Sequence, residues 1–273
     1  MKPGAGGRIA AVMVKDAAEL CTNPGTLLPA VWMAVAAILP GFLVAILAPI
    51  IAGESLAESR EFAEGSGLAV TMVPELATLE GDALVQAFLF HQFGLLLLMV
   101  PVVGSMAIAA HAIIGEKLAR TLEPLLATPI STAELLIAKS MTPLAFGLGL
   151  MWATLAVDIA LISVVAEPGV WQAMIGPRTL AMFFLVGPLL TVTALMLAVI
   201  ISSRVNDPRS AQQLGALVVM PVTAVFVGQL IGQFLVDLRV ILMTGGLLII
   251  VNIVLGMIGV RLFDRERILM KWK

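Results

Sequence analysis

The sequence predicts an all-α, polytopic membrane protein with six transmembrane helices in a single domain, residues 1–273. Hydrophobic residues make up 60% of the chain and charged residues only 12%, whereas soluble domains carry about 25% charged residues. Six long runs contain no Asp, Glu, Lys or Arg except Asp158, and each exceeds the ~20 residues needed to cross a hydrocarbon core. The chain should therefore act within or across a lipid bilayer, and no nucleic-acid partner is expected.

The predicted spans cover residues 26–51, 84–114, 141–166, 180–201, 214–236 and 240–263. The last of them extends past its apolar run to include Arg261. The second is 31 residues long and would measure roughly 46 Å as a straight helix. We expect it to tilt, to kink at Pro101 or to project beyond the hydrocarbon core.

The distribution of basic residues predicts which segments face the cytoplasm. Thirteen of the 16 Lys and Arg residues fall at the termini or in alternate connections, and only Arg60, Arg178 and Arg239 fall in the other connections. Because cytoplasmic segments carry the excess of Lys and Arg, both termini and the 115–139 loop should be cytoplasmic, and the 52–83 loop extracytoplasmic. We expect a multi-pass protein of the cell membrane, the cytoplasmic membrane of a prokaryote.

Residues 1–25 predict an amphipathic helix that lies in the cytoplasmic interface rather than a span. Its apolar and charged residues fall on opposite helical faces. The apolar set is Ile9, Met13, Ala17 and Leu20, and the charged set is Arg8, Lys15 and Glu19. Asn23-Pro24-Gly25 should end this helix. It is either a topological anchor or a contact surface for a cytoplasmic partner.

Few polar residues lie inside the predicted spans, so each is a candidate for a substrate path or for helix packing. Asp158 is the only intramembrane acid, which makes it a functional candidate unless it is neutral or paired with Arg178. His91 is better explained by a bond to a backbone carbonyl or a neighbouring helix than by a metal site, because no second ligand lies at helical spacing. Asn252 should form an interhelical hydrogen bond.

The loop after the second predicted span has the pattern of two short helices joined by a turn. Glu116 and Arg120 are four residues apart with the acid first, the favourable order for a helical ion pair. Pro129 breaks the helix, and Ser131 with Glu134 forms a capping-box pattern that starts the next helix. Apolar residues in this loop suggest a docking surface, unless the interfacial helix covers them.

The run from Glu116 to Lys139 resembles the loop between the second and third spans of ABC exporter permeases of the type-2 superfamily, in the branch of sodium, drug and lipid exporters. The shared pattern is an acid, a basic residue, Thr-Leu-Glu, Leu-Leu, Thr-Pro-Ile-Ser, a Glu and a Lys. Residues 202–213 and 262–269 are similar to that family's loop between spans four and five and to its C-terminal tail. Lys15-Asp16 before the first span is also similar.

The resemblance implies a dimer of six-span permeases, identical or paralogous, with two cytoplasmic ATPase subunits docked beneath. The second and fifth spans should line the dimer midline. A coupling helix between spans two and three would transmit the ATPase movement, through Glu116, Arg120, Glu123, Leu126, Thr128, Pro129, Ile130 and Ser131. Arg8, Lys15 and Asp16 are the candidate residues of the interfacial helix. The partner would bind ATP and Mg²⁺, because this chain has no phosphate-binding loop and is not expected to be an enzyme.

The spans offer Phe, Met, Leu and Thr rather than charge, and the chain contains no Tyr. A hydrophobic or amphipathic substrate that moves outward is therefore expected, with Thr223 and Phe226 of the fifth span as candidate lining. A sodium exporter is the alternative within the family, and would need oxygen ligands to converge, the candidates being Asp158, Thr191, Thr193 and Asn252. An ATP-independent secondary transporter would need more ionisable groups near the midplane. The sequence contains no motif of an intramembrane enzyme.

Overall fold

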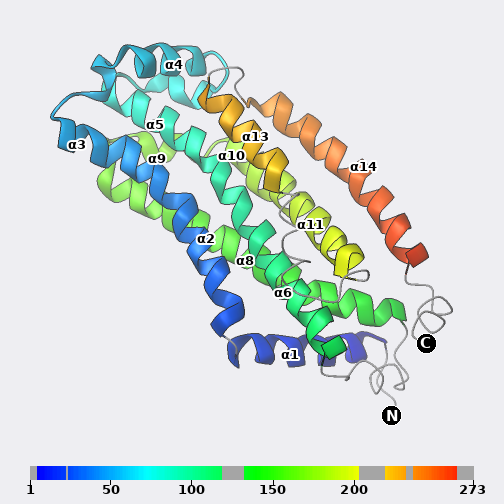
Figure 1. Cartoon of the computed structure of the whole chain (residues 1–273). Coiled ribbons are helices and arrows are strands. Elements are labelled where there is room, and N and C mark those ends of the chain that lie inside the picture. Colours follow the sequence, from blue (N-terminus) through cyan, green and yellow to red (C-terminus); the bar gives the residue numbers. More distant parts are fainter. Residues whose placement is uncertain (1–4, 23, 119–131, 203–218, 232–235, 263–273) are drawn as a thin grey trace.

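A computed structural model of the chain describes residues 5–22, 24–118, 132–202, 219–231 and 236–262. Every regular element in these ranges is a helix and none is a strand, so the prediction of an all-α fold is confirmed (Figure 1). The long helices run side by side as one bundle. Helix α1 (Ala5–Thr22) crosses one end of the bundle and α4 (Arg60–Val70) crosses the other, and we refer to these as the α1 end and the α4 end.

Five helical runs are long and apolar enough to cross a membrane: Leu27–Ala52, Gly81–Ala109, Ile137–Val165, Pro177–Ala198 and Leu238–Gly259. The first run consists of α2 (Pro24–Phe42), a π-helical turn η1 (Leu43–Leu47) and α3 (Ala48–Ala52). The second consists of α5 (Gly81–Phe93), a 3₁₀ turn η4 (Gly94–Leu98) and α6 (Met99–Leu118). The third is α8 (Thr132–Val165), and the last is α14 (Leu238–Leu262). The fourth consists of α10 (Pro177–Ala181), a π-helical turn η5 (Met182–Val186) and α11 (Gly187–Ser202).

The predicted fifth span, 214–236, contains the shorter helix α13 (Val219–Leu230). With 12 residues, α13 falls short of the ~20 residues that a transmembrane helix requires. Residues 203–218 and 232–235, on either side of it, lie outside the described part of the chain. The structure thus supports five spans, and a sixth is not established.

The long second span changes its helical form just before Pro101. Helix α5 passes into η4 at Gly94, and α6 begins at Met99. Proline lacks a backbone N–H and its ring crowds the carbonyl four residues earlier, which is that of Leu97. The α-helical pattern is therefore interrupted at η4, about one turn before Pro101, which is where a proline is expected to disturb a helix.

This second span lies at the centre of the bundle. In its most apolar window 83% of the residues are buried, compared with 17%, 22% and 11% in the first, third and last spans. Helix α6 packs against α2, α8 and α11, while α13 packs along α5, η4 and α6. The expectation that the second span lines a dimer midline stays a prediction, and such a contact would have to use the small part of this span that its own chain leaves exposed.

Helix α1 lies across the bundle and packs against α8 and α2 (Figure 1). It ends at Thr22, and α2 begins at Pro24. A residue before proline is disfavoured in the α-helical conformation, so the proline separates the two helices at the position that the sequence predicted. The location of α1 in a membrane interface stays a prediction.

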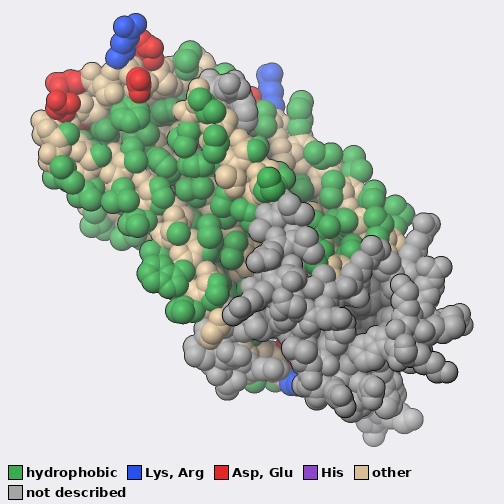
Figure 2. All heavy atoms as spheres, viewed as in Figure 1, with side chains coloured by type: hydrophobic (Ala, Val, Ile, Leu, Met, Phe, Trp, Pro, Cys, Tyr) green, Lys and Arg blue, Asp and Glu red, His purple; other side chains and the backbone are tan. Residues whose placement is uncertain are grey.

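The connection between the first and second spans is folded into helices. It contains η2 (Leu56–Glu58), α4 and η3 (Pro74–Thr78), and the side chain of Leu76 is fully buried in a core shared with Phe88 of α5. On the face shown in Figure 2, charged side chains gather at this α4 end, whereas hydrophobic side chains cover the flank of the bundle. One exposed pair there joins Arg60 to Glu64 at 2.7 Å. This distribution is typical of a bundle whose middle faces hydrocarbon and whose ends face water.

Candidate functional site

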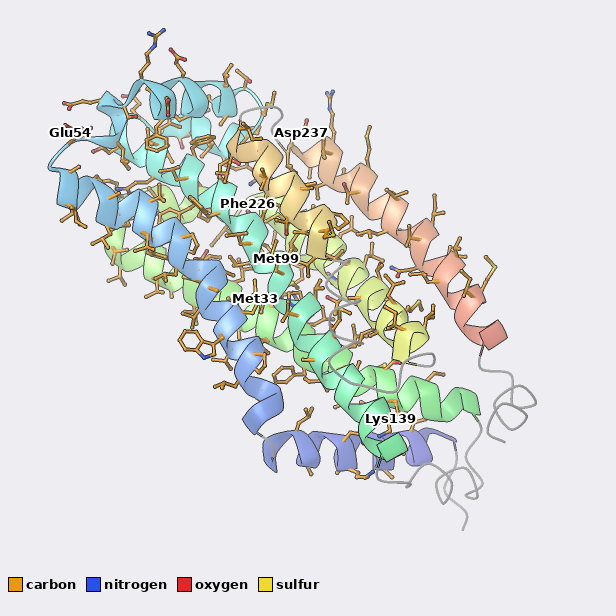
Figure 3. The ribbon with its side chains drawn as sticks, in the orientation of Figure 1. Met33, Glu54, Met99, Lys139, Phe226 and Asp237 are labelled. Carbon is orange, nitrogen blue, oxygen red and sulfur yellow. The ribbon has the colours of Figure 1, made fainter. Side chains whose placement is uncertain are left out.

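At the α1 end, a buried ion pair joins α1 to α8. The Nζ atom of Lys139 lies 2.9 Å from Oδ1 of Asp16, and both side chains are 7% exposed. Figure 3 places Lys139 where α8 meets α1, at the opposite end of the bundle from Glu54 and Asp237. A charge that loses its water must be paired, since leaving it alone costs several kcal/mol. The two charges therefore hold α1 against α8.

Two buried oxygen atoms beside this pair have no hydrogen-bond partner within the described residues: Oδ2 of Asp16 and Oγ1 of Thr142. Thr142 follows Lys139 by three residues and so lies on the same face of α8. Lys15, the neighbour of Asp16, is exposed. The contact between α1 and α8 at this point therefore depends mainly on the bond from Lys139 to Asp16, because the two neighbouring oxygen atoms add no hydrogen bond to it.

Most residues predicted to couple the chain to an ATPase lie outside the described part of the structure. These are Arg120, Glu123, Leu126, Thr128, Pro129, Ile130 and Ser131. Glu116 lies in α6 and Arg8 in α1, but their side chains are likewise not described. The structure does describe the two helices that frame this segment: α6 ends at Leu118, α8 begins at Thr132, and α8 packs against both α6 and α1. Lys139 of the ion pair thus lies on α8 seven residues after Thr132, the first described residue beyond this segment.

A second polar cluster lies in the half of the bundle nearer α4. Arg178, at the start of the fourth span, is 4% exposed. Its Nε donates a hydrogen bond to the carbonyl of Val236 at 2.8 Å, and its Nη1 donates to Nδ1 of His91 at 2.7 Å. Because arginine keeps all its protons, Nδ1 of His91 is the acceptor and the imidazole proton lies on Nε2. The sequence predicted Arg178 in the connection before a fourth span starting at residue 180, whereas the helical run begins at Pro177 and includes Arg178.

Gln92 extends this cluster to α13. Its Oε1 accepts a hydrogen bond of 2.5 Å from Nε2 of Gln229, and both side chains are buried. Successive residues differ by ~100° around a helix, so His91 and Gln92 reach different neighbours from one turn of α5. Since Val236 precedes α14, one turn of the second span is connected to the fourth span, α13 and the start of the last span.

A glycine allows an acidic residue to approach Arg178. Any Cβ atom at Gly176 would overlap the Glu75 side chain, so glycine lets the carboxylate of η3 lie against the backbone two residues before Arg178. Glu75 and Asp237 are the acidic residues whose charges act on the Arg178 guanidinium. This buried cation therefore has negative charge on its α4 side.

Asp158 of α8 lies beside this cluster without joining it directly. The side chain is 6% exposed and lines a cavity of about 10 Å³ together with His91, Arg178 and Thr179. Within the described residues no ion pair joins Asp158 to Arg178. Of the two alternatives that the sequence left for Asp158, neutral or paired with Arg178, the pairing is not found, because the guanidinium bonds to His91 and Val236 instead. No group of three His, Cys, Asp or Glu residues in the described ranges could hold a metal ion.

Asn252 joins the last span to the fourth, as the sequence predicted. Its Nδ2 donates to the carbonyl of Leu189 at 3.0 Å, and its Oδ1 accepts from the hydroxyl of Thr193 at 2.9 Å. Of the two fifth-span candidates, Thr223 is exposed and donates to the carbonyl of Val219. Phe226 packs against Phe93 of α5, with ring centroids 5.7 Å apart.

An apolar cavity of about 490 Å³ lies between α11, α13 and α14, with further lining from η4 and η5. Its walls include Leu190, Leu197, Val222, Val225, Leu248 and Val251, and among the described lining residues Thr193 and Thr244 are the only polar ones. Thr223 and Phe226 are not part of this lining, although their neighbours on α13 are. The sequence could not show this, because α13 is apolar on all sides and a shift of one residue turns a helix by ~100°.

The family model of the "ABC-2 family transporter protein" matches residues 11–241, from within α1 to the first turn of α14. No curated protein and no solved structure matches the chain significantly. The matched range includes the Asp16–Lys139 pair, the polar cluster and most of the apolar cavity. The chain belongs to the ABC-2 transporter family and is a permease component of an ABC transporter, which implies association with an ATP-binding subunit in a membrane complex.

Proposed function

We propose that this chain is the permease of an ABC exporter in which the junction of α1 and α8 receives the movement of the ATPase subunit. The observation that carries the proposal is the buried pair of Asp16 and Lys139. This pair lies at the end of the bundle where residues 119–131 leave α6 and enter α8. The sequence of that segment resembles the ATPase-contacting loop of type-2 exporters, so a force applied there would reach α8 first.

Helix α8 is suited to carry such a force. It is continuous for 34 residues, or roughly 50 Å at 1.5 Å per residue. Asp158 lies on the same helix, roughly 39 Å from Thr132 by the same rise. A displacement of the first turns of α8 would therefore reach the polar cluster in the other half of the bundle. The ion pair would make α1 move with it.

The apolar cavity supports a hydrophobic or amphipathic substrate. Its volume of about 490 Å³ lies within the ~300–1,000 Å³ of typical small-molecule sites, and its walls lack charge. The sodium alternative has less support, because its candidate ligands are separated. Thr193 and Asn252 bond to each other, whereas Asp158 lines the other cavity. Outward transport follows from the resemblance to exporters, and two permease chains would complete the pathway.

The test of this proposal separates ATPase docking from ATPase coupling. Ile130→Asp places a charge in the segment assigned to the ATPase contact, where an unpaired charge in an apolar groove costs a few kcal/mol. We expect the variant to insert normally but to lose its ATPase subunit during affinity purification. Ile175→Asp is the matched control, because Ile175 is 51% exposed near the opposite end of the bundle. Equal recovery of the ATPase subunit with both variants would refute the assignment.

A further inference from the structure

The small cavity beside Asp158 has polar walls whose hydrogen-bonding groups are not satisfied by the protein. Most of its lining side chains are buried, including apolar Leu97 and Phe183. Nε2 of His91 and Oγ1 of Thr179 have no partner at hydrogen-bond geometry within the described residues, although the Ala173 backbone lies close enough to His91 to act on its imidazole. Asp158 has no hydrogen bond to the described residues either. Buried polar groups in proteins are nearly always paired, with protein or with ordered water.

We propose that this cavity is a binding site for one water molecule. The water would accept a hydrogen bond from Nε2–H of His91 and donate one to the carboxylate of Asp158, with the Thr179 hydroxyl as a third partner. The volume of about 10 Å³ corresponds to the smallest cavities that hold a water, ~10–15 Å³. Apolar cavities stay dry, but a cavity with two to four polar partners binds water.

This water gives Asp158 a structural connection that direct contacts do not provide. It extends the bonds of His91 and Arg178 to the third span. One series of hydrogen bonds then runs from Asp158 through the water, His91 and Arg178 to the Val236 carbonyl. This series of hydrogen bonds joins the third, second and fourth spans and ends at the start of the last span. Asp158 is then a positioning residue that links α8 to the rest of the bundle. This inference does not depend on the proposed transport activity.

A single methyl group at Gly94 tests the site. Gly94 lines the cavity and has helical backbone angles, and a Cβ atom there would have Met182 Cε as its nearest neighbour, at 3.9 Å. Alanine therefore fits without a clash, and its methyl group reduces the space that the cavity of about 10 Å³ leaves for a water. If the cavity were dry, the methyl would fill a void and improve helix propensity, which raises the melting temperature. If it holds the water, Gly94→Ala leaves His91 and Asp158 unpaired, and the melting temperature falls.

Gly149→Ala is the matched control, because Gly149 is exposed in α8 and a Cβ atom there would meet nothing within 4 Å. We expect this variant to match or exceed the melting temperature of the wild type in detergent. Thr179→Val provides a second, gentler variant: it should lower the melting temperature if the hydroxyl binds the water, and raise it if the hydroxyl is unpaired. A rise for both Gly94→Ala and Thr179→Val would overturn the proposal.

A readout specific to water completes the test. Infrared difference spectra of the wild type in H₂¹⁶O and H₂¹⁸O should contain an isotope-sensitive O–H stretch from a buried water. Gly94→Ala should abolish this band, whereas Gly149→Ala should retain it. A band of equal intensity in Gly94→Ala would contradict the assignment.

Discussion

Replacing Lys139 with Met should loosen α1 from the bundle, because it leaves the carboxylate of Asp16 buried without its partner. Both side chains are 7% exposed and their charged atoms are 2.9 Å apart. Breaking a buried pair from one side typically costs 3–5 kcal/mol. Helix α1 can move outward and let water reach the carboxylate, so we expect the lower value, about 3 kcal/mol. At roughly 2–4 °C per kcal/mol for a chain of this size, the melting temperature should fall by roughly 6–12 °C.

The double variant Asp16→Asn/Lys139→Met tests the physical reason. It removes both charges and retains similar side-chain volumes, and neutral replacement of a buried pair is often without cost. Its melting temperature in detergent should therefore be close to that of the wild type and above that of Lys139→Met. Lys15→Met is the control, since an exposed lysine contributes under ~1 kcal/mol. If the two residues form an ion pair, the fall in melting temperature of the double variant is smaller than the sum of the falls for the two single variants. A fall equal to that sum would refute the ion pair.

Three further predictions concern topology, substrate and assembly. With Cys21 replaced by Ser, an impermeant thiol reagent on intact cells should label Leu68→Cys of α4 but not Val14→Cys of α1; the reverse pattern would invert the orientation. Val251→Trp should fill the apolar cavity and slow transport of a hydrophobic probe. Ile250 is 61% exposed on the same helix, so Ile250→Trp should leave transport unchanged. Equal effects of the two variants on transport would exclude the cavity from the substrate path. Native mass measurement of the purified complex should give two permease chains with two ATPase subunits, and a mass of one of each would exclude the dimer.

The helical bundle follows from the apolar runs, because a run of ~20 residues has the length of a transmembrane helix, which satisfies its backbone hydrogen bonds internally. The length of an apolar run does not show, however, which other helices will pack against it. The second span was expected at a dimer midline, yet it is the most enclosed of the five. Its mean hydropathy of 2.0 is the lowest of the five, but that of the exposed third span is 2.1, so hydropathy does not separate the enclosed span from one that faces outward.

The polar contacts could be predicted only in part. Asp16 and Lys139 were both candidates by resemblance, but they are separated by 123 positions and no spacing rule connects them. His91 was expected to bond to a backbone carbonyl or a neighbouring helix, and its partner Arg178 was missed because that residue was assigned to the connection before the fourth span. Pro177, a residue favoured in the first helical turn, was the available signal that the helix begins before Arg178.

ATP-dependent uptake into inside-out membrane vesicles tests the central claim most directly. Vesicles would contain the chain with its co-purified ATPase subunit, and uptake of a hydrophobic fluorescent probe would be followed with and without ATP. We predict ATP-dependent uptake by the wild type, none by Lys139→Met although the ATPase subunit stays bound, and recovery in Asp16→Asn/Lys139→Met. Uptake that persists without the ATPase subunit, or wild-type uptake by Lys139→Met, would contradict a permease driven through the α1–α8 junction.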